Sequence, residues 1–235
     1  MTDPRHRLIV ALDVSSAAAA RKIVAAVGDS AHIYKVGMQL YTAEGPSIVR
    51  DLVASGRRVF LDLKYHDIPN TVGGAVREAS QLGVSLMTVH AAGGSKMLRA
   101  AAEAATSDGP IVLAVTVLTS LDDNELNKIG VRGGVTDQVL RLAALALASG
   151  CRGIVASAQE ASALREELGP DFVIVTPGVR PAGSGKDDQA RVVTPSEAIE
   201  AGATHIVVGR PITEAEDPGA EARAILGQLS GSLTR

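Results

Sequence analysis

The chain has 235 residues, 46% of them hydrophobic, which is enough to bury the core of one large α/β domain. A formal net charge of -3, 2% aromatic residues and no tryptophan argue against a nucleic-acid-binding protein. No apolar run approaches the ~18 residues of a membrane span, and the first residues lack the pattern of a signal peptide. The single cysteine, Cys151, permits no internal disulfide bond. We therefore expect a cytoplasmic protein with neither a membrane nor a nucleic-acid partner.

Short apolar runs rich in β-branched residues alternate along the chain with alanine-rich segments. The runs predict eight strands, and most segments between them begin after Ser, Thr, Asp or Pro and end at Gly, as helices do. The expected strands cover residues 8–14, 32–38, 58–64, 85–91, 111–118, 153–158, 172–178 and 205–210. The expected helices cover residues 15–28, 46–56, 71–83, 95–105, 136–150, 158–169, 194–202 and 217–229.

The expected strands are nearly continuous in apolar residues, a pattern typical of a parallel sheet that is covered by helices. Eight strand-helix units of about 29 residues predict an α/β protein with a closed (β/α)8 barrel, a TIM barrel. We expect residues 1–235 to form this barrel as a single catalytic domain. A doubly wound sheet is the competing fold. It usually carries a glycine fingerprint after its first strand, where this chain has Leu-Asp-Val-Ser-Ser.

The most informative stretch is Asp-Leu-Lys-Tyr-His-Asp-Ile-Pro-Asn-Thr, at residues 62–71. On a regular strand, residues two apart point to the same face, so Asp62 and Lys64 should face the same way. Asp67 follows, within expected reach of the same ammonium group. Burying such groups costs several kcal/mol per ion unless opposite charges offset it. Charges at the end of a barrel strand therefore indicate chemistry.

Charged and polar residues also stand at the ends of the other expected strands. In a barrel these ends converge on one mouth, which is where such enzymes bind their substrates. Lys35 lies in an otherwise apolar strand, where the Asp62 carboxylate would stabilise its charge. The residues expected at the mouth are Asp13, Lys35, Asp62, Lys64, His90, Thr119, Ser120, Arg180 and Arg210.

The loops after the last two strands are candidates for a phosphate site. Arg180 and Arg210 could clamp a phosphate dianion, and Gly209 would let its backbone amide approach closely. The polar segment between Arg180 and Thr194 is longer than a minimal connection, and we expect it to act as a lid. An array of alternating lysines and aspartates next to a phosphate suits a reaction that creates negative charge on carbon, with Lys64 as the proton donor.

Six motifs together resemble one known family. They are residues 62–71, Leu-Asp-Val with Asp13, Tyr-Lys-Val-Gly with Lys35, Val-Leu-Thr-Ser, Thr-Pro-Gly-Val-Arg and Val-Val-Gly-Arg-Pro-Ile-Thr. Over residues 8–227 the chain is similar to the orotidine 5′-phosphate decarboxylases of the bacterial type. The resemblance implies conversion of orotidine 5′-phosphate to uridine 5′-phosphate and carbon dioxide, the last step of pyrimidine synthesis. It also implies that the reaction uses neither a metal nor an organic cofactor.

The same resemblance implies a role for each matching residue. Lys64 would donate the proton, and Asp62 would lie beside the carboxylate of the substrate. The implied catalytic residues are Lys35, Asp62, Lys64 and Asp67, with Lys35 bridging Asp62 and the ribose. The implied substrate contacts are Asp13 with a ribose hydroxyl, Thr119 and Ser120 with the pyrimidine, Gln189 with the base and phosphate, and Arg180, Gly209 and Arg210 with the phosphate. The family implies a homodimer with shared active sites, into which Asp67, Ile68 and Thr71 of the partner would reach.

Three alternatives stay open at this point. Sugar-phosphate decarboxylases and aldolases with the same pattern use its carboxylates to hold Mg²⁺, but they usually have an acidic residue where this chain has Lys35. Asp62, His66 and Asp67 could themselves form a metal site, although His66 falls one residue off the inward face. A barrel that binds a nucleotide phosphate without turning it over is the non-enzymatic hypothesis. We expect His90 to orient a neighbouring group by hydrogen bonding rather than to act as a base.

Overall fold

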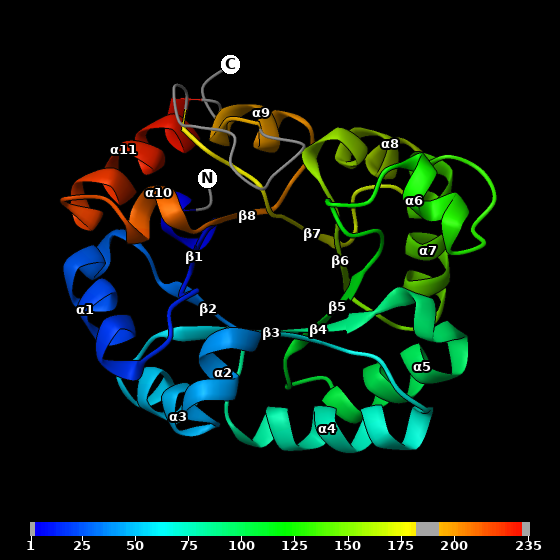
Figure 1. Cartoon of the computed structure of the whole chain (residues 1–235), viewed down its shortest axis with the longest axis horizontal. Helices are drawn as coiled ribbons and strands as arrows, with labels where there is room; N and C mark the ends of the chain where they lie inside the picture. Colours follow the sequence, from blue (N-terminus) through cyan, green and yellow to red (C-terminus); the bar gives the residue numbers. More distant parts are fainter. Residues whose placement is uncertain (1–2, 182–192, 232–235) are drawn as a thin grey trace.

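The computed structural model describes residues 3–181 and 193–231. In this part of the chain, eight parallel strands close into a barrel in chain order, and the last strand pairs with the first. Helices surround the barrel on the outside (Figure 1). The strands are β1 (Leu8–Ala11), β2 (Ile33–Gly37), β3 (Arg58–Tyr65), β4 (Leu86–His90), β5 (Ile111–Val115), β6 (Gly153–Val155), β7 (Val173–Thr176) and β8 (His205–Val208). The expected (β/α)8 barrel is confirmed.

All eight expected helices are present, with ends within a few residues of the expected ones. They are α1 (Ala17–Val27), α3 (Ser47–Ala54), α4 (Pro69–Gln81), α5 (Gly94–Ala105), α7 (Val135–Ala148), α8 (Ala158–Leu168), α9 (Pro195–Glu200) and α11 (Pro218–Gly231). Their starts follow capping rules. The Ser16 hydroxyl accepts from the Ala19 N–H, and Thr194 with Glu197 forms a capping box.

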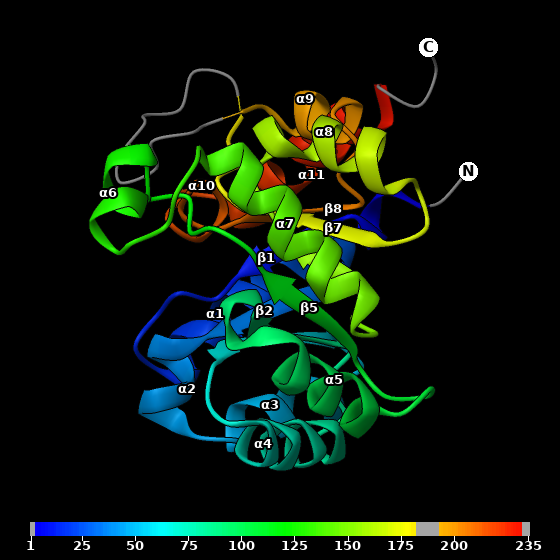
Figure 2. The same cartoon turned by 90° about the vertical axis from the view of Figure 1, so that its right-hand side faces the viewer.

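Three further helices were not expected from the sequence: α2 (Met38–Glu44), α6 (Asp123–Lys128) and α10 (Arg210–Thr213). Each is short, and each buries one residue, so it shows no apolar period. Short 3₁₀ turns cover Pro4–His6, Gly28–Ser30 and Ala91–Gly93. Each of the helices α2, α6 and α10 lies in the connection that follows a strand. Figure 2 shows α6 and α10 on the side toward which the β5 arrow points. They therefore belong to the mouth of the barrel.

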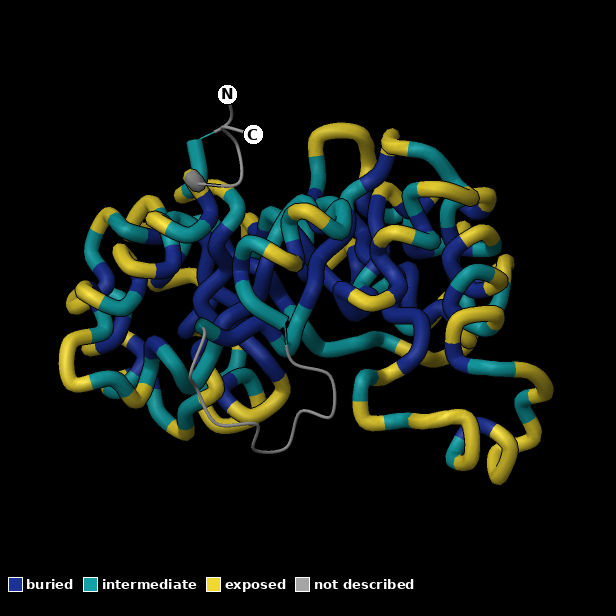
Figure 3. The backbone as a smooth tube through the Cα atoms, turned by 90° about the horizontal axis from the view of Figure 1, so that it is seen from above, coloured by how far each residue is buried: buried dark blue, intermediate teal, exposed yellow. Residues whose placement is uncertain are grey.

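The strands bury both of their faces, which explains their continuous apolar sequences. One face fills the interior of the barrel with residues such as Ile9, Ile33, Phe60 and Leu113. The other packs against the helices in a larger apolar cluster. Figure 3 shows buried backbone through the centre and exposed backbone along the outer helices. Among the described helices, none has both the length and the apolar character to cross a membrane.

Strand β3 departs from regular pairing just where its charges lie. Leu61 pairs with Met87 and Tyr65 pairs with Val89, so four steps along β3 correspond to two along β4. Within this bulge, Lys64 has a φ of 52°, a left-handed conformation that costs a residue with a side chain about 1 kcal/mol or more. Asp62 and Lys64 face the same cavity, as expected, but a bulge that interrupts the strand brings them there rather than simple alternation.

His205 begins β8, at the end of the barrel opposite the mouth, and it makes the stability of the fold dependent on pH. Burial is the main cause that lowers the pKa of His205 to about 4, and the positive charges of Arg58, Arg7 and His6 lower it further. An unfolded histidine has a pKa of about 6.5. As the pH falls from about 6.5 to about 4, the unfolded chain therefore binds a proton that folded His205 does not. We expect the free energy of unfolding to fall by about 2 to 3 kcal/mol over this window from this residue.

Denaturant titrations at pH 7 and pH 4.5 on the native chain and on His205→Gln measure this contribution. The native chain should lose more stability than the variant between the two pH values. Equal losses in both proteins would mean that other groups cause the acid sensitivity.

Candidate active site

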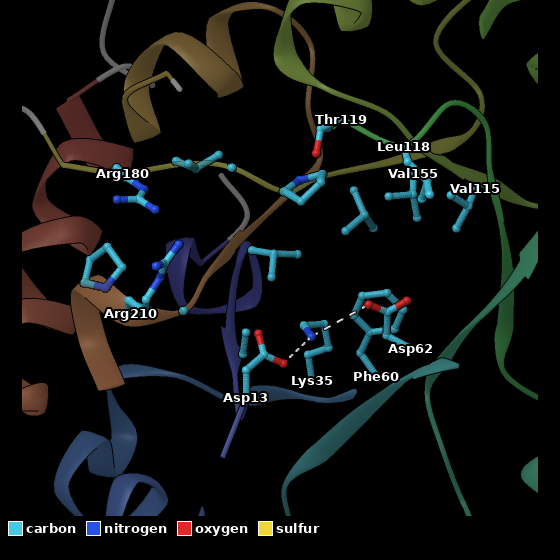
Figure 4. A pocket seen from close by; sticks show the side chains of 18 of the residues that line it. Asp13, Lys35, Phe60, Asp62, Val115, Leu118, Thr119, Val155, Arg180 and Arg210 are labelled. Atoms are coloured by element: carbon cyan, nitrogen blue, oxygen red, sulfur yellow. Dashed lines mark hydrogen bonds and ion pairs between the residues drawn. The ribbon is translucent and has the colours of Figure 1, made fainter. Parts of the chain in front are cut away.

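A cavity of about 590 Å³ opens at the mouth of the barrel (Figure 4). Its wall includes apolar side chains from several strands, among them Phe60, Val115, Val155, Val175 and Val207. Figure 4 shows Arg180 and Arg210 close together on one side of this cavity and Asp13, Lys35 and Asp62 on another. The cavity therefore combines a pair of arginines, an apolar wall and a group of acids and lysines.

The acids and lysines form one continuous row. Lys35 Nζ lies 2.7 Å from Asp13 Oδ1 and 3.7 Å from Asp62 Oδ2. Lys64 Nζ lies 2.9 Å and 3.0 Å from the two oxygens of the Asp62 carboxylate. The side chains of Lys35 and Asp62 are only 11% and 13% exposed, so water screens their attraction weakly. The charges therefore alternate along a line of contacting side chains. We call this line the charge row; it consists of Asp13, Lys35, Asp62 and Lys64.

Gly37 gives Lys35 the room to join this row. A Cβ atom at Gly37 would lie 2.9 Å from Lys35 Nζ, closer than real Cβ atoms come, and 3.1 Å from Asp13 Oδ1, closer than most do. A side chain at residue 37 would therefore require the ends of the Lys35 and Asp13 side chains to shift, and the glycine of the Tyr-Lys-Val-Gly motif avoids this shift. The sequence did not single out Gly37, because only the path of the lysine side chain reveals its function.

Thr88 on β4 is a second residue that sequence reasoning missed. Its side chain is fully buried, and its Oγ1 donates to Asp62 Oδ1 at 3.0 Å and accepts from the backbone N–H of Lys64 at 2.9 Å. The only signal in the sequence is a hydroxyl residue within an apolar strand, and threonine is common in strands. The contact itself depends on the bulge in β3.

The expected phosphate residues lie on the other side of the cavity. Arg180 follows β7 and is buried, Gly209 links β8 to α10, and Arg210 is the first residue of α10; all three line the cavity. The backbone N–H of Arg180 donates to the carbonyl oxygen of Val193 at 3.0 Å. Gln189 and most of the lid segment expected between Arg180 and Thr194, namely residues 182–192, lie outside the described residues.

The two residues expected near the pyrimidine differ in position. Thr119 lies in the loop after β5 and lines the cavity. Ser120 is exposed and is not part of the cavity wall in this single chain. Because β5 ends at Val115, both residues belong to a loop rather than to the strand end that the sequence predicted.

Asp67, Ile68 and Thr71 are exposed and lie outside the cavity of their own chain. Asp67 Oδ1 accepts from the backbone N–H of Ile68 at 2.6 Å, at the start of α4. The expectation that Asp67 lies within reach of Lys64 of the same chain is therefore wrong. The chain leaves β3 after Tyr65 and carries Asp67 away from the barrel axis, which the residue spacing could not reveal.

His66 and His90 stack against each other, with ring centres 5.3 Å apart. His90 Nδ1 accepts from the Ala92 N–H at 3.4 Å, and burial is the main cause that lowers the pKa of His90, followed by the positive charge of His66 and Lys64. This hydrogen bond caps the turn Ala91–Gly93, and the orienting role expected for His90 stays a prediction. In residues 3–181 and 193–231, no three His, Cys, Asp or Glu side chains are grouped to hold a metal ion, so Asp62, His66 and Asp67 do not form such a site.

The fold and the cavity define an enzyme of the (β/α)8-barrel class, with charged residues gathered at the carboxyl ends of its strands. The model of the orotidine 5′-phosphate decarboxylase / HUMPS family matches residues 6–225. The chain therefore belongs to this family, and the resemblance noted from its motifs is confirmed.

Individual relatives agree over almost the whole chain. The orotidine 5′-phosphate decarboxylase of Moorella thermoacetica is 51% identical, over 96% of this chain and 92% of its own length. That of Anaeromyxobacter dehalogenans is 53% identical, over 96% of this chain and 99% of its own length. The crystal structure of the Lactobacillus acidophilus orotidine 5′-phosphate decarboxylase superposes with a TM-score of 0.85 at 40% identity, covering 95% of this chain and 99% of the other.

Proposed function

We propose that this chain converts orotidine 5′-phosphate to uridine 5′-phosphate and carbon dioxide, the last step of UMP synthesis, with neither a metal nor an organic cofactor. The observation that carries the proposal is that one cavity holds both the charge row and the arginine pair. The names and high identity of its relatives support the same substrate.

The substrate is held by contacts along its whole length. Arg180 and Arg210 bind the phosphate dianion, and the backbone amide of Gly209 adds a hydrogen bond. Asp13 and Lys35 bind the ribose hydroxyls. The contacts assigned to the pyrimidine come from Thr119, Ser120 and Gln189. The binding energy of the phosphate then holds the pyrimidine ring against the charge row and in this way contributes to the rate of decarboxylation.

The reaction breaks the bond between the ring and its carboxylate, and the electron pair stays on the ring carbon. Lys64 Nζ donates a proton to that carbon as carbon dioxide leaves, and solvent later restores the proton. The Asp62 carboxylate holds the Lys64 ammonium at 2.9 Å, so the donor is positioned before the substrate arrives. A fixed ammonium group next to an apolar wall stabilises developing negative charge better than mobile water does.

A second copy of the chain completes the site in this proposal. Asp67 and Ile68 lie between β3 and α4, and Thr71 lies in the first turn of α4, all outside their own cavity. Ile68 exposes 66% of its surface. A single exposed apolar side chain is common on protein surfaces, so the support for the dimer is the family resemblance. In a homodimer with shared active sites, these residues enter the partner's cavity, and Asp67 adds a second acid next to Lys64. We assign the dimer to the cytoplasm, where a single reduced cysteine is expected.

The absorbance change of orotidine 5′-phosphate with purified protein tests the activity directly, with and without prior dialysis against a chelator. We expect equal turnover in both samples, because Lys35 next to Asp62 repels a divalent cation. Loss of turnover that Mg²⁺ restores would favour the sugar-phosphate enzymes of the same group. Binding of uridine 5′-phosphate by folded protein without turnover of orotidine 5′-phosphate would favour a nucleotide-binding module.

A further inference from the structure

We propose that Thr88 is a positioning residue for the decarboxylation, since its hydroxyl group fixes both Asp62 and the backbone of Lys64. This inference rests on the proposed function. Nothing in the resemblance or in the family match assigns a role to this threonine. Its side chain is absent from the cavity wall, so it acts through its neighbours rather than on the substrate.

The hydroxyl group uses both of its hydrogen-bonding capacities on the charge row. A threonine hydroxyl has one hydrogen to donate and lone pairs to accept. The hydrogen goes to Asp62 Oδ1 at 3.0 Å, and a lone pair accepts the Lys64 N–H at 2.9 Å. One atom of β4 thus connects the acid that holds the ammonium group with the backbone that carries it.

The bulge explains why Lys64 needs this partner. The register of β3 against β4 is regular at Leu61 and resumes only at Tyr65, so the N–H of Lys64 lies between the two regular pairings. An unpaired buried N–H is unfavourable, and a left-handed residue persists only where its surroundings hold it in place. Thr88 supplies the missing acceptor and so stabilises the conformation in which Lys64 Nζ meets Asp62.

The same hydroxyl group also orients the acid. Asp62 Oδ1 accepts from Thr88 Oγ1 and from Lys64 Nζ, while Oδ2 faces both lysines. The χ1 angle of threonine is restricted, and Thr88 is fully buried within a paired strand, so the hydroxyl is a fixed donor. Without it, the carboxylate keeps contacts only with flexible lysine side chains among the residues that the structure describes.

The test compares Thr88→Val, which keeps the shape and removes the hydroxyl, with Thr88→Ser, which keeps the hydroxyl. Thr116→Val is the matched control, because Thr116 is also buried, directly after the neighbouring strand β5, but its hydroxyl donates to the carbonyl oxygen of Val155. For each protein we would measure kcat, KM and the dissociation constant of uridine 5′-phosphate. A purely structural defect would move all three constants.

We expect Thr88→Val to lower kcat on the order of 10- to 100-fold, as small displacements of catalytic groups do, with product affinity nearly unchanged. Thr88→Ser and Thr116→Val should both stay near the native kcat. The proposal is overturned if Thr88→Val keeps the native kcat, if product affinity falls with it, or if Thr88→Ser is as impaired as Thr88→Val. Thr88→Ala against Thr88→Ser repeats the comparison if the valine variant does not fold.

A crystal structure of the Thr88→Val protein separates this inference from the proposed function, because it does not depend on turnover. Lys64 Nζ should then leave the Asp62 carboxylate, or the bulge at Lys64 should change its conformation. An unchanged charge row would overturn the positioning role even in an active enzyme. Native protein without turnover would instead contradict the proposed function.

Discussion

Replacement of Lys64 by alanine is expected to abolish nearly all decarboxylation. The residue is the proposed proton donor, worth ~10²- to 10⁴-fold, and also a fixed charge that stabilises the carbanion, worth a further ~10²- to 10³-fold. We therefore expect kcat to fall by about 10⁵-fold. The affinity for uridine 5′-phosphate should change little, because the phosphate binds on the arginine side of the cavity. Steady-state or single-turnover kinetics, together with a product-binding titration, measure both quantities.

Lys22→Ala is the matched control for the loss of one positive charge. Lys22 is exposed on α1 and does not line the cavity. Its replacement should leave both constants near their native values. A Lys64→Ala protein whose product affinity falls as steeply as its kcat would contradict the assignment, since Lys64 would then bind the ground state as strongly as the transition state.

Replacement of Arg210 by alanine is expected to weaken binding rather than chemistry. A hydrogen bond to a charged group contributes about 1.5 to 3 kcal/mol, so we expect KM for orotidine 5′-phosphate to rise roughly 10- to 150-fold. Arg180 remains in the cavity and retains part of the phosphate affinity. Turnover of the phosphate-free nucleoside should be the same in the variant and the native enzyme, because that substrate makes no contact with Arg210.

Arg223→Ala controls for the loss of a surface arginine, since Arg223 lies on α11, 3.9 Å from Asp217 and outside the cavity. If Arg210→Ala reduced activity on the nucleoside as much as activity on the nucleotide, the phosphate assignment of Arg210 would be wrong.

The fold could be predicted because its signal is local and repeated. Strands buried on both faces must be apolar, as residues 8–11 and 206–208 are, and helices that cover a barrel carry one apolar face. The helices α2, α6 and α10 could not be predicted, because each is too short for a period to emerge. Their positions depend on the shape of the mouth rather than on their own sequences.

Part of the candidate site could also be predicted from the repeated pattern of strands. Parallel strands carry residues such as Lys35 and Asp62 to one end of the barrel, whatever their distance along the chain. The bulge at Lys64 could not be predicted, because it depends on the register between β3 and β4. Thr88 and Gly37 gain their roles only through that three-dimensional arrangement. The expected reach from Asp67 to Lys64 was wrong within this chain, because residue spacing does not give the path of the chain after Tyr65. Ser120 lies in a loop outside the cavity wall, because β5 ends at Val115 and not at residue 118 as expected.

The central claim is that the charge row and the arginine pair bind opposite ends of one nucleotide. A crystal structure with uridine 5′-phosphate bound tests it most directly. We predict that the phosphate lies between Arg180 and Arg210 and that Lys64 Nζ lies about 3 to 3.5 Å from the ring carbon that carried the carboxylate. A phosphate bound elsewhere, or a pyrimidine out of reach of Lys64, would contradict the account.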